Sequence, residues 1–249
     1  MGEMFDVDAG VRELVEGFRA VAEEERAPQM QAYLKSDLAF MGAKVGVTRS
    51  VVQRFLREHE ELDAAGVVAL AEALWATRIW ECRAGAVMAL SKRVKLLAPE
   101  HIDVIERLLR DSYTWALVDG MAMDVVAPLV ERHPELNGTL DRWVEDADFW
   151  IRRTALLALL PGLRRGEGDW DRFARYADAM LEEREFFVRK AIGWVLRETG
   201  KKRPALVAGW LEPRAARASG VTMREAVKYL DDEQRERLLA LRPTGRRGL

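Results

Sequence analysis

A carboxylate and an indole stand four residues apart in the segment Trp-Ala-Leu-Val-Asp. In a helix, Trp115 and Asp119 would project from the same face. A carboxylate can stabilise a developing positive charge or orient a water molecule, and an indole face attracts cations by about 0.5–2 kcal/mol. The pair therefore indicates chemistry that passes through a cation. A core tryptophan with an aspartate at its margin is the alternative.

A second group of chemically capable residues lies between residues 185 and 198. Lys190, Trp194 and Arg197 recur at helical spacing, so two cations and a flat aromatic surface share one side. That side suits a polyanion, although basic side chains extending past a packed core tryptophan would give the same pattern. In a helix interior, glycine at position 193 lowers the stability of the helix by about 1 kcal/mol relative to alanine, and other interactions of the fold must compensate for this loss.

An arginine pair lies in the segment Phe-Trp-Ile-Arg-Arg-Thr that begins at residue 149. An arginine at the start of a helix can hold a phosphate through two parallel hydrogen bonds. Arg153 is the candidate for this role, and Arg152 is its rival.

Composition excludes several other classes of chemistry. The chain has 249 residues, of which 49% are hydrophobic and 32% charged, and it can fill one extended domain or two compact ones. A single cysteine, Cys82, and three separated histidines, His59, His101 and His133, do not have metal-ligand spacing. The sequence also lacks phosphate-binding, dinucleotide-binding and serine-hydrolase motifs. We expect neither metal nor cofactor, and we expect a cytoplasmic protein without a membrane anchor.

The net charge of −2 hides an asymmetry along the chain. Residues 1–150 carry −10, whereas residues 151–249 carry +8. A basic C-terminal part indicates binding to phosphate even when the whole chain is acidic. Scattered, solvated arginines are the alternative.

Helix-forming residues dominate, and sustained alternation typical of strands is absent, so the sequence predicts an all-α protein. The expected helices are 9–25, 28–36, 48–59, 64–76, 81–92, 101–110, 114–132, 135–144, 149–160, 169–182, 185–199, 203–211, 222–229 and 231–240.

A repeat appears when similar segments are aligned. Segments beginning at Ile79, Tyr113, Phe149 and Phe186 are 34, 36 and 37 residues apart. This spacing predicts HEAT-like helix pairs stacked into a curved solenoid whose concave face binds the ligand, and a conventional helical bundle is the alternative. We expect one repeat domain over 1–249, with flexible termini at 1–8 and 243–249.

Several of these segments together resemble the AlkD-type DNA glycosylases, HEAT-like proteins of the DNA alkylation repair family. The matching segments follow the family's order over most of the chain: 33–35, 40–42 with Arg49, 74–75, 112–119, 133–136, 149–157 and, most specifically, 185–198. Two positions depart from the family pattern, because Thr114 replaces a frequent tryptophan and Met88 a frequent aspartate. These departures affect fine substrate preference more than the class of reaction.

The resemblance implies excision of N3- and N7-alkylated purines, such as N3-methyladenine and N7-methylguanine, from double-stranded DNA to leave an abasic site. By the same resemblance, Trp115 and Asp119 are catalytic, Trp194 is a second aromatic wall, and Arg153 holds a backbone phosphate. Lys190, Arg197, Tyr33 and Arg152 are further candidates for DNA contacts. We expect a monomer. A non-catalytic HEAT-like protein that binds DNA or protein remains the alternative, and lesion preference is left open.

Overall fold

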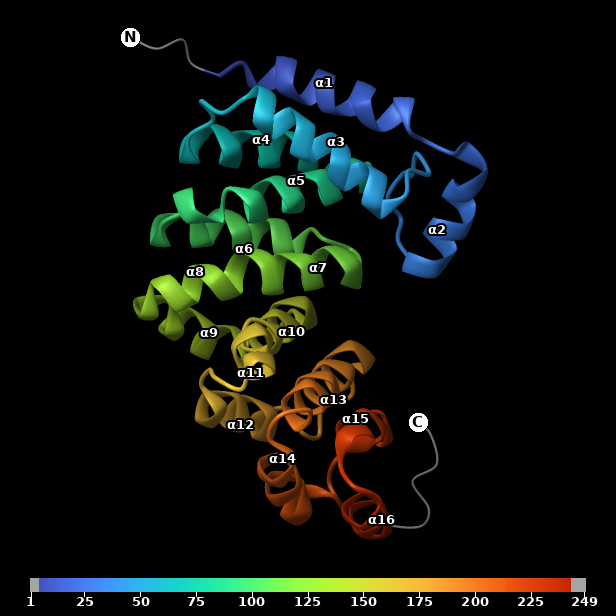
Figure 1. Cartoon of the computed structure of the whole chain (residues 1–249), viewed down its shortest axis with the longest axis vertical. Helices are drawn as coiled ribbons and strands as arrows, with labels where there is room; N and C mark the ends of the chain where they lie inside the picture. The colour runs from blue at the N-terminus through green and yellow to red at the C-terminus, as the bar shows by residue number, and fades with distance from the viewer. Residues whose placement is uncertain (1–4, 243–249) are drawn as a thin grey trace. The chain divides into compact units, whose positions relative to one another are not determined.

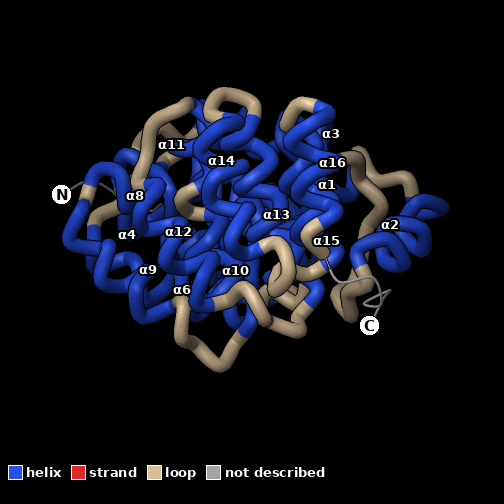
Figure 2. Tube along the Cα trace, turned by 90° about the horizontal axis from the view of Figure 1, so that it is seen from below, coloured by secondary structure: helices blue, strands red, loops and turns tan. Residues whose placement is uncertain are grey.

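The computed structural model describes residues 5–242, and helices account for nearly all the regular structure in that range (Figures 1 and 2). Extended pairing among these residues is limited to one isolated bridge between Ala39 and Ile79. The predicted all-α class is therefore confirmed. The helices group into two compact units, Met1–His133 and Pro134–Leu249, called unit 1 and unit 2 below.

Unit 1 contains eight α-helices, α1 to α8, with short 3₁₀ turns between some of them (Figure 1). The α-helices are α1 (Val7–Ala20), α2 (Ala27–Leu34), α3 (Val45–Glu58), α4 (Ala64–Ala76), α5 (Trp80–Lys92), α6 (Ile102–Arg110), α7 (Trp115–Met121) and α8 (Ala127–Arg132). The 3₁₀ turns are Glu24–Arg26, Val94–Leu96 and Pro99–His101. Helices α4 with α5 and α6 with α7 form consecutive pairs, as the repeat predicts.

Unit 2 continues the pairing with helices α9 to α16. They are α9 (Asn137–Trp143), α10 (Phe149–Leu157), α11 (Leu160–Arg165), α12 (Trp170–Ala179), α13 (Phe186–Gly200), α14 (Pro204–Leu211), α15 (Gly220–Ala226) and α16 (Asp232–Ala240). The 3₁₀ turns are Pro134–Leu136, Glu212–Arg214 and Val227–Tyr229. Helix α13 packs along α15 and also contacts α10 and α11, so it is the centre of this unit.

Two details of the helix prediction need correction. The expected helix 149–160 ends at Leu157, and a separate helix, α11, follows. Pro161 occupies the second position of α11, where a missing N–H costs nothing. Val7 and Asp8, expected in a flexible terminus, begin α1, whereas the remaining predicted termini at 1–4 and 243–249 lie outside the described residues.

The register of the repeat also differs from the sequence alignment. The second helix of each pair begins at Trp80, Trp115, Phe149 and Phe186, so the starts are 35, 34 and 37 residues apart. The shift arises because the residues that precede the first two helices, Ile79 and Thr114, are extended. In the corrected register, Asp119, Arg153 and Lys190 each occupy the fifth position of their own helix.

Arginine at the fourth position of three second helices binds the turn that precedes the helix. Arg83 donates to the Trp75 carbonyl at 3.0 Å, and Arg189 donates to the Glu183 carbonyl at 2.7 Å. Arg152 donates to the carbonyls of residues 146 and 147 at 2.6 and 2.9 Å. These arginines therefore fix the segments that lead into their helices by binding main-chain carbonyls.

Residues 115–132, predicted as one helix, contain a π-helical segment at Ala122–Val126. The Ala127 amide donates to the Ala122 carbonyl, five residues back. Pro128 follows, and it can neither donate a hydrogen bond nor fit closely against the preceding turn, which accounts for the wider helix here. The π segment follows Asp119 within one turn, a position often found at functional sites.

Gly193 allows α15 to approach α13 closely. A Cβ atom at this position would lie 2.8 Å from the Thr222 carbonyl oxygen and 2.8 Å from the Glu225 Cβ atom. Because the Thr222 carbonyl oxygen belongs to the backbone, it cannot move aside by a side-chain rotation. The helix-propensity cost of Gly193 is therefore offset by the packing of the two helices.

We predict opposite effects for two Gly→Ala substitutions in unit 2. Gly193→Ala should destabilise the protein by about 1–3 kcal/mol, because the added methyl overpacks the α13–α15 contact. Gly209→Ala, in α14 with nothing within 4 Å of the added Cβ, should stabilise by up to about 1 kcal/mol. Urea unfolding at neutral pH measures both. Equal effects of the two substitutions would contradict the packing role of Gly193.

Candidate functional site

In unit 1, the structure brings together three of the residues that the sequence singled out: Tyr33, Trp115 and Asp119. The Tyr33 ring meets the Trp115 ring edge to face, with centroids 5.6 Å apart. Tyr33 is 72% exposed and Trp115 is half-buried, whereas Asp119 is only 7% exposed. The group is an aromatic surface with a sheltered carboxylate one helical turn from the indole.

Buried neighbours fix the start of the helix that carries Trp115 and Asp119. Thr114 precedes the helix, is buried, and donates its hydroxyl to the Leu34 carbonyl at 3.3 Å. This bond ties α7 to the end of α2, the helix that carries Tyr33. Leu117 and Val118, in the same turn, are buried. The local packing thus holds the indole and the carboxylate in one orientation.

In unit 2, Arg152 and Arg153 have different surroundings. Arg152 is bound by its own turn, and it also pairs with Glu183 at 2.8 Å. Arg153 is 3% exposed, donates to the Phe187 carbonyl, and lies 5.8 Å from the centroid of the Phe187 ring. Both guanidinium groups therefore have protein partners.

Lys190 and Arg197 share one face of α13, because both bind the same carboxylate. Lys190 Nζ lies 2.5 Å from one oxygen of Glu225, and Arg197 donates to the other. Lys228 also donates to Glu225, at 3.0 Å. Three cations around one buried carboxylate leave a net positive surface.

Glu225 was not found from the sequence, since two of its three partners, Lys190 and Arg197, lie 35 and 28 residues away and only Lys228 is local. Burial raises the pKa of this carboxyl, but hydrogen bonds from Lys190 and Lys228 and the charge of Arg197 outweigh burial and lower the pKa to about 2. Glu225 is therefore ionised throughout the neutral range. It holds the long basic side chains in place.

Trp194 is half-buried on α13, between Lys190 and Arg197 in the sequence. No ring contact or hydrogen bond of its indole is found among residues 5–242. The indole surface is therefore free of aromatic neighbours in this part of the chain, as a binding surface requires.

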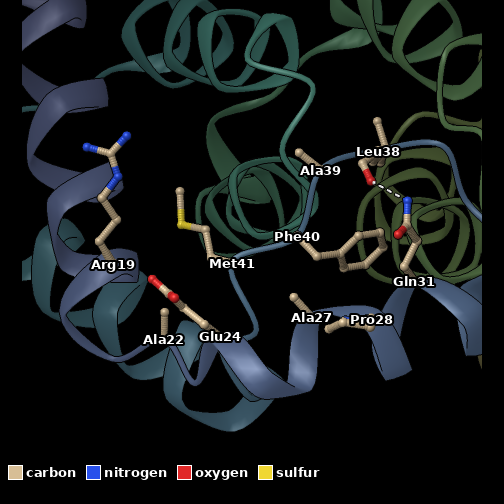
Figure 3. Close-up of a pocket in the computed structure, with 10 residues that line it drawn as sticks. All are labelled: Arg19, Ala22, Glu24, Ala27, Pro28, Gln31, Leu38, Ala39, Phe40 and Met41. Carbon is tan, nitrogen blue, oxygen red and sulfur yellow. Dashed lines mark hydrogen bonds between the residues drawn. The ribbon is translucent and has the colours of Figure 1, made fainter.

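An open hollow of about 610 Å³ lies in unit 1 (Figure 3). It is lined by Arg19, Glu24, Gln31, Phe40, Met41 and smaller residues, and Gln31 donates to the Leu38 carbonyl at 3.4 Å. None of the predicted site residues lines it. We assign no chemistry to this hollow.

Residues 5–242 contain no cluster of three or more histidine, cysteine, aspartate or glutamate side chains that could hold a metal ion. No helix in the same range has both the length and the apolar character needed to cross a bilayer.

Comparison with a protein-family model gives a match over residues 14–230, and the family is described as DNA alkylation repair enzyme. The match covers most of the chain, including every candidate site residue. A comparison with curated protein sequences finds no match.

Similar solved structures support the same fold. A predicted DNA alkylation repair enzyme from Enterococcus faecalis is 23% identical, with a TM-score of 0.76, over 85% of this chain and 97% of that one. AlkD2 from Streptococcus mutans is 19% identical, with a TM-score of 0.61, over 82% and 99% of the two chains. The protein smu.31 from Streptococcus mutans is 16% identical, with a TM-score of 0.59, over 84% and 99%.

We predict that Glu225 contributes pH-dependent stability. Its pKa is lower in the folded protein than in the unfolded chain, so the contribution is complete above about pH 4.5 and is lost as the pH falls toward 2. Glu225→Gln should therefore cost up to about 3 kcal/mol at pH 7 and progressively less below pH 4.5. Urea unfolding at several pH values tests this. Glu236→Gln, an exposed control in the same unit, should show no such trend.

Proposed function

The chain belongs to the DNA alkylation repair enzyme family, and from this premise we propose that it is a monofunctional DNA glycosylase. It hydrolyses the N-glycosidic bond of cationic alkylated purines, such as N3-methyladenine and N7-methylguanine, in double-stranded DNA. The products are a free base and an abasic site. The observation that carries this proposal is the Tyr33, Trp115 and Asp119 group, in which a sheltered carboxylate lies beside an aromatic surface.

The chemistry of the substrate explains why these residue types suit the reaction. An N3- or N7-alkylated purine already carries a positive charge, so it leaves as a neutral base without needing a strong acid. The electron pair of the glycosidic bond leaves with the base, and the sugar develops oxocarbenium character. Water then adds to the sugar and loses a proton. A transition state of this kind is stabilised by negative charge and by aromatic faces.

We assign the roles in unit 1 accordingly. Asp119 stabilises the sugar cation and accepts a hydrogen bond from the attacking water. Its low exposure supports this role, because a carboxylate screened from solvent interacts more strongly with a nearby cation. Trp115 offers its face to the sugar, and Tyr33, packed edge-on against Trp115, extends the surface toward solvent.

Residues of unit 2 contribute DNA contacts in this proposal. Lys190 and Arg197 carry the net positive surface around Glu225, and Trp194 adds an indole between them. Arg153 holds a backbone phosphate, and because this residue is only 3% exposed, its guanidinium must become accessible when DNA binds. Arg152 is the weaker candidate, because its own turn and Glu183 already use its donors.

We predict that Asp119→Asn separates binding from chemistry. Single-turnover release of N7-methylguanine should fall by about 10²–10³-fold, because only the charge that faces the sugar cation is lost. Affinity for undamaged duplex should stay within about twofold. Asp103→Asn, an exposed control in α6, should behave like the unaltered protein. Unchanged base release by the Asp119 variant would refute its role, and duplex binding by the unaltered protein without any base release would favour a non-catalytic DNA-binding protein.

We also predict that excision continues in excess EDTA and leaves an uncut backbone. The histidines and Cys82 lack metal-ligand spacing, and no lysine stands in the Trp115–Asp119 motif to form a Schiff base with the sugar. Alkylated duplex treated with the protein and EDTA should therefore break only after hot alkali. Nicks without alkali, or a covalent complex trapped by borohydride, would show that the mechanism includes amine attack.

A further inference from the structure

Tyr113 is the exposed residue of a loop in unit 1 whose other members are held in place. The loop joins α6 to α7. Arg83 binds both the Asp111 carbonyl and the Asp111 carboxylate, the latter at 2.7 Å. Ser112 and Thr114 are buried, and each donates its hydroxyl to a carbonyl of a neighbouring helix. Between these fixed points, the Tyr113 side chain is 47% exposed.

The backbone of Tyr113 is in the left-handed region, with φ of 55°. This conformation costs an L-residue with a large side chain about 1–2 kcal/mol. The strained backbone therefore lowers the stability of the folded protein, and it directs an aromatic ring into solvent two positions before Trp115. Strain of this kind, maintained by fixed neighbours, is characteristic of binding and active sites.

Arg78 has the same conformation at the equivalent place before α5, with φ of 55°. Its backbone is also fixed, because its amide donates to the Trp75 carbonyl at 3.3 Å and its carbonyl accepts from the Ala39 amide at 3.0 Å. The exposed Arg78 guanidinium lies over the Tyr113 ring, 5.4 Å from the centroid. Thus two strained positions bring a cation and an exposed ring together.

The charged groups around Tyr113, which are Arg78, Arg83 and Asp111, carry a net positive charge. The buried Arg83 guanidinium lies 5.9 Å from the centroid of the same Tyr113 ring and is paired with Asp111. Arg78 has no carboxylate at ion-pair distance within residues 5–242. When the plane of a guanidinium group stacks on an aromatic ring, the N–H groups along its edge stay available to bind a carboxylate or a phosphate.

We propose that Arg78 and Tyr113 bind a phosphodiester of the DNA strand that carries the alkylated base. This proposal rests on the proposed function, since it takes DNA as the ligand. Arg78 donates to the phosphate oxygens, and the Tyr113 ring holds the guanidinium in place. Tyr113 is two positions before Trp115 in the chain, a span of at most about 7 Å, so the phosphate would lie close to the nucleotide whose sugar contacts Trp115. Arg78 and Tyr113 position the strand and are not catalytic residues.

The test uses Arg78→Asn and Tyr113→Asn, because asparagine tolerates the left-handed conformation and should leave the fold intact. The control is Arg107→Gln, which removes an exposed arginine of unit 1 that already pairs with Glu72 at 2.9 Å. Affinity for an undamaged duplex is measured from low to physiological salt. Thermal unfolding is measured alongside, so that a structural effect is recognised.

Arg78→Asn should weaken binding about tenfold at physiological salt and reduce the slope of log affinity against log salt by about 0.9, the value for one phosphate contact. Tyr113→Asn should weaken binding through the misplaced arginine, whereas Arg107→Gln should do neither. Base release by Arg107→Gln should stay within twofold of that by the unaltered protein. An unchanged slope for Arg78→Asn overturns the proposal.

The two proposals fail in different ways. Unaltered protein that binds duplex but releases no base overturns the glycosylase and leaves the salt titration of Arg78→Asn fully interpretable, because that titration uses undamaged DNA. If the slope is unchanged while base release is normal, the glycosylase stands and the phosphate contact at Arg78 is wrong. A lowered melting temperature with an unchanged slope assigns the two strained residues to folding alone and also overturns the proposal.

Discussion

The turn that leads into the second helix of each pair determines where the candidate site side chains stand. Arginines at the fourth position of α5, α10 and α13 donate to carbonyls of the segments that lead into these helices, and Arg83 also binds Asp111 in the turn before α7. Once the turn is fixed, the fifth position of the next helix is fixed as well. Asp119, Arg153 and Lys190 stand at that position in three different helices, so one repeated geometry carries a carboxylate in one case and cations in the others.

The buried carboxylates of the two units, Asp119 and Glu225, have different surroundings. Glu225 is surrounded by cations that lower its pKa to about 2, so its charge is used within the protein to order basic side chains. The aromatic rings of Tyr33 and Trp115 pack edge to face beside the sheltered Asp119 carboxylate. A carboxylate beside aromatic faces is suited to a cationic ligand, whereas one surrounded by lysine and arginine supports binding of an anionic one.

Sequence patterns predicted the helices well, because apolar periodicity and proline or glycine breaks are local signals. They also singled out Trp115 with Asp119 in unit 1 and the basic and aromatic residues along α13 in unit 2, whereas Tyr33 came only from the family resemblance. They did not give the helix register, since the left-handed residues Arg78 and Tyr113 move the helix starts and neither is a glycine. Nor did they indicate Glu225, because contacts over 28 and 35 residues leave no periodic signature. Gly193 was recognised as unusual, but its reason, the close approach of Thr222, is visible only in three dimensions.

A site of this kind is compatible with a demanding reaction only if the substrate contributes much of the driving force. At 4 Å, a carboxylate and a cation interact by about 4 kcal/mol at an effective dielectric constant of 20, and an aromatic face adds about 0.5–2 kcal/mol. Together these amount to roughly three to four powers of ten in rate. A neutral purine would need an acid in addition, and the Trp115 motif contains none beyond the ionisable Asp119. An alkylated purine carries its positive charge already, so a carboxylate and two aromatic rings are the residue types that its departure requires.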